Sequence, residues 1–125
     1  MEEDKMWNDA NKDIFEIFDK VKEKETLPLV CPVCSKREAH IYMYRFKNNK
    51  GSIWAWCSAC RVSEHERVTL PIWWKNSEVL DENLLGVHPD MLEEKKVFVD
   101  KYVNMLIKGE YIDKTIEQNL MNEKG

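Results

Sequence analysis

The sequence has few glycines and no long apolar run, and both absences narrow its possible functions. Only four glycines occur in the 125 residues and they are scattered, so no glycine-rich phosphate-binding loop is present. No apolar stretch approaches the roughly 20 residues that a membrane-spanning helix needs. The first residues, MEEDKMWNDANKD, are acidic and lack the apolar centre of a secretory signal. We therefore expect a cytoplasmic protein with no membrane contact.

The sequence also lacks a recognisable catalytic constellation. The three histidines, His40, His65 and His88, lie far apart. Glu64, His65 and Glu66 form a tight cluster of carboxyl and imidazole groups, but alternation along a strand would turn His65 away from both glutamates. We therefore expect no enzymatic activity.

The helical parts of the chain are expected at its two ends. With 43% hydrophobic and 34% charged residues, the chain 1–125 has the composition of a single globular domain. After HPD, a stripe of apolar residues predicts a helix that Gly109 ends, and a short final helix follows. Residues 72–125 are therefore the C-terminal helical part. In residues 1–28, apolar residues at three- and four-residue steps predict an N-terminal amphipathic helix: Met6, Ala10, Ile14, Ile17, Phe18 and Val21.

The middle of the chain alternates with a period of two. HIYMYRF and SIWAWC each place their aromatic rings on one side of a predicted strand, and NNKG between them supplies a turn in which Gly51 is free to take positive φ. A third strand is expected in RVSEHERVTL, before Pro71. The predicted fold class is therefore α+β, with a three-stranded antiparallel sheet over residues 29–71 packed with N-terminal and C-terminal helices.

All four cysteines occur in two C-x-x-C pairs, CPVC (Cys31, Cys34) and CSAC (Cys57, Cys60). One pair precedes the first predicted strand and the other follows the second, so a hairpin brings both to the same end of the sheet. Four thiolates at this spacing predict tetrahedral coordination of Zn²⁺. Iron stays open as an alternative on the same thiolates, and His65 is the alternative ligand. Disulfides would require an oxidising compartment.

Positions 29–71 resemble a zinc ribbon, in which two zinc knuckles are turns beside a β-hairpin. Knuckles of this family often carry glycine after the second cysteine, whereas this chain has Ser35 and Arg61. Such a closed four-sulfur site leaves no position for a reactive water, so its role is structural. The resemblance implies one structural Zn²⁺ with these ligands: Cys31, Cys34, Cys57 and Cys60.

Charge is segregated along the chain. Residues 1–28 hold 5 basic and 9 acidic side chains, residues 29–75 hold 8 and 3, and residues 76–125 hold 6 and 11, which sum to a net charge of −4. We expect a non-catalytic protein that binds another protein. The build is similar in style to small acidic immunity proteins of bacterial toxin–immunity systems, which implies a basic toxin or nuclease as partner.

Two sets of residues are the candidates for binding. Adjacent Trp73 and Trp74 are expected to place at least one ring outward as an anchor. The partner-binding candidates are Trp73, Trp74, Glu78, Asp81 and Glu82, with Glu93 and Glu94 as a further acidic pair. The alternative function is a nucleic-acid-binding zinc ribbon with a transcription-related or regulatory role, using Arg45, Lys47 and Lys50 beside the rings. Against it, the rings can instead form the core beneath the helical parts.

Overall fold

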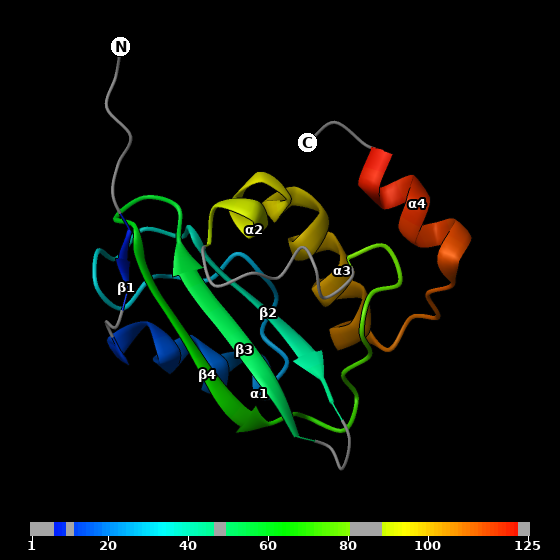
Figure 1. Ribbon diagram of the computed structural model, residues 1–125, viewed down its shortest axis with the longest axis horizontal. Coiled ribbons are helices and arrows are strands. Elements are labelled where there is room, and N and C mark those ends of the chain that lie inside the picture. Colours follow the sequence, from blue (N-terminus) through cyan, green and yellow to red (C-terminus); the bar gives the residue numbers. More distant parts are fainter. Residues whose placement is uncertain (1–6, 10–11, 47–49, 81–88, 123–125) are drawn as a thin grey trace.

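The computed structural model describes residues 7–9, 12–46, 50–80 and 89–122 (Figure 1). Within them lie four strands, a short 3₁₀ helix and four α-helices. Their bounds are β1 Asn8–Asp9, η1 Lys12–Phe15, α1 Glu16–Lys22, β2 Ala39–Arg45, β3 Lys50–Cys57, β4 Val62–Thr69, α2 Asp90–Glu94, α3 Lys96–Lys108 and α4 Lys114–Asn122.

The sheet has the order β1-β4-β3-β2. β2, β3 and β4 form an antiparallel meander, and β1 adds two residues parallel to β4 through the pairs Asn8↔Val62 and Asp9↔Ser63. The predicted α+β class, with a three-stranded antiparallel sheet and helices at both ends, is confirmed. The two residues of β1 were not expected.

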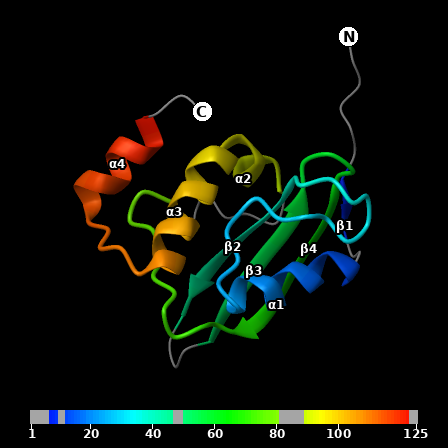
Figure 2. The same cartoon turned by 180° about the vertical axis from the view of Figure 1, so that it is seen from behind.

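The helices cover the two faces of the sheet separately. His40 of β2 lies on one face, with Nδ1 at 2.8 Å from Asp100 Oδ1 of α3. The β4 glutamates Glu64 and Glu66 lie on the other face, where Lys12 of η1 forms ion pairs with both. α3 and α1 are therefore on opposite sides of the sheet, as Figure 2 shows from behind.

This arrangement divides the core by side-chain type. The cross-strand pair Tyr42↔Trp54 and the neighbouring Trp56 lie on the face toward α3, and all three side chains are buried. Ile41 and Ile53 are fully buried on the other face, toward η1 and α1. The interpretation of these rings as core holds, but the C-terminal part alone covers the aromatic face, with α2, α3 and Trp74, whereas the N-terminal helix covers the aliphatic one.

The N-terminal helix starts later than the apolar pattern indicated. Asn8 donates its backbone N–H to the Arg61 carbonyl oxygen at 2.8 Å, so this stretch belongs to the sheet, and helical structure begins at Lys12. Met6 and Ala10 of the predicted stripe lie outside the described residues. At the other end, Gly109 ends α3 with a φ of 76°, as expected for a C-terminal glycine. No helix in the described ranges is long and apolar enough to cross a membrane.

Gly51 was expected to supply a positive φ in a turn, and this expectation is wrong. Gly51 lies inside β3, paired with Arg45 and Val68, and its φ is not positive. A Cβ atom at this position would lie 2.1 Å from the Tyr44 carbonyl oxygen and 2.9 Å from Leu70 Cδ1. Glycine is needed here for space, because two backbone segments approach each other closely.

Candidate metal centre

The two C-x-x-C turns have the same backbone conformation. The Ser35 N–H donates to the Cys31 carbonyl at 2.9 Å, and the Arg61 N–H donates to the Cys57 carbonyl at 3.0 Å. Ser35 and Arg61 have φ values of 69° and 66°, in the left-handed region. Both knuckles therefore adopt the turn that glycine would adopt more easily, although neither carries it, at about 1–2 kcal/mol of backbone strain per residue.

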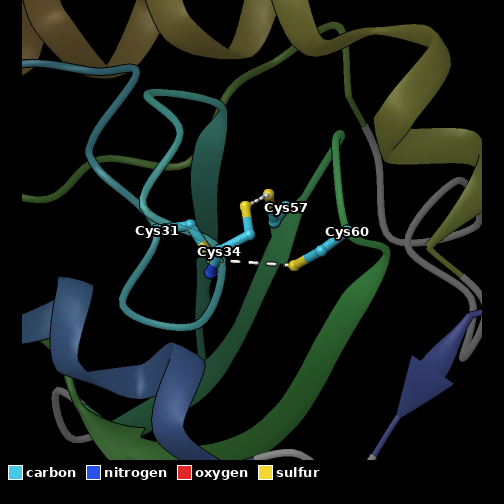
Figure 3. Close-up of side chains that lie close together, drawn as sticks. All are labelled: Cys31, Cys34, Cys57 and Cys60. Atoms are coloured by element: carbon cyan, nitrogen blue, oxygen red, sulfur yellow. Dashed lines mark hydrogen bonds between the residues drawn. The ribbon is translucent and has the colours of Figure 1, made fainter.

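The turns bring the four thiols together (Figure 3). All four Sγ atoms lie within 4.8 Å of one another. The Cys31–Cys60 and Cys34–Cys57 sulfur pairs are each separated by 3.7 Å, and all four cysteines are free. A tetrahedral ion with metal–sulfur bonds of about 2.3 Å requires sulfur atoms about 3.8 Å apart. The donor set and its spacing therefore fit one tetrahedral metal ion.

Backbone N–H groups favour thiolates at this site, whereas burial opposes them. The Val33 and Ala59 N–H groups point at Cys31 Sγ and Cys57 Sγ, each at 3.3 Å, as donors to thiolates do. Burial raises the pKa of the Cys57 thiol to about 12 in the metal-free chain. A metal must therefore displace a proton from this sulfur, and once four thiolates bind it no coordination position remains for water.

A polar network lies directly beside the second knuckle. Ser58, between Cys57 and Cys60, has its Oγ 3.0 Å from His40 Nε2, and His40 Nδ1 lies 2.8 Å from Asp100. Ser58 Oγ also lies 2.7 Å from Glu93 Oε1. The predicted hairpin brings His40 and Ser58 to the same end of the sheet, whereas nothing in the sequence indicated that Glu93 and Asp100 meet them. The order Ser58–His40–Asp100 has the geometry of a catalytic triad.

The placement of protons shows that Ser58 is not activated. The Glu93 carboxylate cannot donate, so its contact with Ser58 requires the hydroxyl proton of Ser58. His40 Nε2 must then donate to Ser58 and cannot take its proton, as the base of a triad does. Burial alone would raise the pKa of Glu93, but hydrogen bonds from Ser58, Lys96 and Trp56 outweigh it and hold the pKa below its ordinary value. The network joins the knuckle to α2 and α3.

Replacing Glu93 with glutamine should therefore weaken the fold. We expect Glu93→Gln to lower the free energy of unfolding by about 1–3 kcal/mol, because Ser58, Trp56 and Lys96 lose a charged acceptor. A lowered carboxyl pKa contributes stability above the unfolded value of about 4.3, so urea unfolding at pH 7 measures the full effect. The exposed neighbour is the control: Glu94→Gln should change stability by less than about 0.5 kcal/mol. Covalent labelling of Ser58 by a fluorophosphonate would contradict the assignment.

The candidate partner-binding residues differ in how far their side chains are exposed. Trp74 is 3% exposed and packs edge-on against Tyr42 and Tyr102, whereas Trp73 is half-buried. Glu93 belongs to the network described above. Glu78 and Glu94 are exposed, and Asp81 and Glu82 lie outside the described residues.

The candidate nucleic-acid residues are also only partly available. Arg45 Nη2 donates to the carbonyl oxygens of Pro71 and Trp74 at 2.7 and 2.9 Å, so this guanidinium holds the loop after β4. Lys50 is exposed, and Lys47 lies outside the described residues. Arg67 also lies among the cations interleaved with the rings in the sequence, and the structure places it on the same face as Lys50, with its guanidinium carbon 5.9 Å from the Phe46 ring centre.

Sequence reasoning also missed two exposed side chains and a buried acid. Ile72 is 88% and Tyr111 is 75% exposed, and no periodic pattern covers the loops that carry them. Glu117 of α4 is fully buried, where Oε1 accepts hydrogen bonds from Ser77 Oγ at 2.6 Å and from the Glu78 N–H at 2.7 Å. This carboxylate fixes α4 against the segment that follows β4.

Comparison of the chain with protein-family models, with curated proteins and with solved structures gave no match. The resemblance to zinc ribbons therefore depends on the residues themselves. The four gathered thiols are consistent with a zinc-knuckle-like site.

Proposed function

We propose that this protein is a non-catalytic, zinc-stabilised binding protein whose partner is another protein. The observation that carries the proposal is the exposure of two large apolar side chains, 88% for Ile72 and 75% for Tyr111. Isoleucine and tyrosine cost free energy when they stay in water, and aromatic residues are enriched among the anchors of protein interfaces.

The two side chains belong to loops that are held together. Lys75 donates to the Ile112 carbonyl at 2.8 Å, and its ammonium lies 6.0 Å from the Tyr111 ring centre. Tyr102 fixes the Lys75 carbonyl with a hydrogen bond of 2.8 Å. A surface whose backbone is already fixed loses little conformational entropy when it binds, so it suits a specific partner. We call Ile72, Trp73 and Tyr111 the apolar loop surface.

The metal in this proposal is Zn²⁺. Its ordinary tetrahedral cysteine site matches the gathered sulfurs, and the role that follows is structural. A narrower form of the proposal is an immunity or inhibitor role against a basic toxin. The net charge of −4 supports this form, since opposite charges accelerate association.

A double variant tests the protein-binding proposal. The zinc-loaded chain is used as bait in a lysate of the native host, with the product of the neighbouring gene tested first. We expect a bound protein whose affinity falls at least about tenfold on combining Ile72→Ala with Tyr111→Ala, because interface anchors contribute more than about 1 kcal/mol each. Calorimetry with the purified partner measures the change.

The control removes exposed apolar groups from another surface. Met91 and Val97 are 39% and 36% exposed on α2 and α3, and the pair Met91→Ala and Val97→Ala should leave the affinity unchanged. If both double variants lose affinity equally, or if no captured protein binds one more weakly than the other, the apolar loop surface is not the binding site.

A second candidate function is binding of single-stranded nucleic acid. Lys50, Arg67 and the 43%-exposed Phe46 ring share one face of the sheet, and cations beside aromatic rings bind phosphates and stack on bases. Retention on single-stranded DNA that falls steeply with salt and is lost with Arg67→Glu would favour this function over the first.

A further inference from the structure

The outer edge of β4 is only partly covered by another strand. β1 pairs with Val62 and Ser63 alone, and in the described part of the chain no strand continues beside residues 64–69. Figure 1 shows β1 at one end of this side. β4 is eight residues long and contains no proline, so its backbone is able to pair further.

The direction of the backbone groups follows from the pairing with β1. The Arg61 carbonyl accepts the Asn8 N–H, and the pair Asp9↔Ser63 continues the ladder. Because backbone groups alternate in direction along a strand, the N–H and C=O groups of His65, Arg67 and Thr69 point to the uncovered side. The side chains of these three residues are exposed as well.

The two faces that border this edge differ in charge. Glu64 and Glu66 are ion-paired with Lys12 on the face toward η1. His65 and Arg67 lie on the opposite face and form no ion pair with the rest of the described chain. Alternation in EHER thus places two glutamates that share one lysine on one face and His65 with Arg67 on the other. Burial against Trp54 lowers the pKa of His65, so at neutral pH Arg67 supplies the positive charge of this face.

A second copy of this chain does not fit the edge. The two-fold antiparallel registers that pair five or more β4 residues are centred on Glu64, His65, Glu66 or Arg67. The register centred on His65 places Glu64 opposite Glu66 of the second copy, and the other three place Glu64, Glu66 or Arg67 opposite itself. Like charges directly opposite each other destabilise strand pairing. Pairing of β4 with β4 of a second copy is therefore unfavourable, and a strand that pairs with this edge must carry a different pattern of charge.

We propose that the β4 edge binds an extended segment of another protein by strand addition, with acidic side chains at alternate positions above His65 and Arg67. Main-chain hydrogen bonds would supply affinity and the alternate side chains specificity. This inference rests on the protein-binding function proposed above and specifies how that binding occurs.

Peptides of defined charge test the proposal on the full zinc-loaded chain. One peptide alternates threonine with glutamate and the other alternates threonine with lysine. At millimolar concentration, we expect the glutamate peptide to slow hydrogen exchange of the His65, Arg67 and Thr69 amides by about tenfold, as measured by NMR, because these N–H groups become bonded. The lysine peptide should not. Arg67→Glu should reverse the preference, and Lys114→Glu, at an exposed position of α4, should leave it unchanged.

Failure of strand addition can be distinguished from failure of the protein-binding function. Unchanged exchange of the three amides with both peptides, or equal slowing by both, overturns strand addition. An oligonucleotide that shifts the His65 and Arg67 side-chain signals, while neither peptide protects the amides, would assign this face to a polyanion instead. If the peptides fail but Ile72→Ala with Tyr111→Ala still abolishes partner capture, only the β4 edge is wrong and the protein-binding function stands.

Discussion

Removal of the proposed zinc ion by a strong chelator should unfold the sheet, and this is the largest effect that we expect. Four-cysteine sites contribute on the order of 10 kcal/mol to folding, which equals or exceeds the whole stability of an ordinary domain. Cys57→Ser should do the same, since Cys57 is buried at the end of β3 and serine is a poor zinc ligand. Near-ultraviolet circular dichroism of the buried Trp56 and Trp74, alongside metal analysis, measures the loss.

A change in the same knuckle that leaves the sulfurs intact is the control. Ser35→Gly relieves the left-handed strain at a φ of 69° and should raise the free energy of unfolding of the zinc-loaded chain by about 1 kcal/mol. A metal-free chain with unchanged stability, or purified protein without one zinc per chain, would remove the basis of the structural-zinc proposal.

The second large effect is expected at Gly51, far from the sulfurs. Gly51→Ala should cost about 3 kcal/mol or more, because the new methyl group would lie 2.1 Å from the Tyr44 carbonyl oxygen, and backbone cannot move aside as a flexible side chain can. Thermal and urea unfolding of the zinc-loaded variant measure the change.

Comparison with Gly109, the other described glycine, separates the cost of steric crowding from the cost of a left-handed backbone. Gly109 has a φ of 76°, but a Cβ there would meet no atom within 4 Å. Gly109→Ala should therefore cost only the left-handed strain of about 1–2 kcal/mol. Equal costs at the two positions would mean that the close approach of β2 and β3 relaxes without penalty.

The strands and the gathering of the four cysteines were predictable because their signals are local. Alternation of apolar and polar residues indicates a strand directly, and a pair of cysteines in one turn constrains its own geometry. The φ of 76° at Gly109 likewise follows from a single residue at the end of an apolar stripe.

The remaining features depend on contacts between distant residues. Asn8 and Asp9 form β1 only because β4 offers them an edge, and two residues carry no periodic signal. Glu117 has the pattern of an exposed helical residue, yet it is buried because it binds the backbone of the segment after β4. Glu93 and Asp100 likewise reach Ser58 and His40 only because α2 and α3 pack on the sheet.

The left-handed conformations of Ser35 and Arg61 also bear on how the proposed zinc ion would rebind after it has been removed. In an open loop, residues with a side chain leave this conformation for the more populated regions of backbone space. Recapture of an ion must then select a minor population of loops, which slows rebinding and lowers the affinity relative to a glycine-bearing loop. The protein would thus be a slower and weaker competitor for scarce zinc than its four sulfurs suggest.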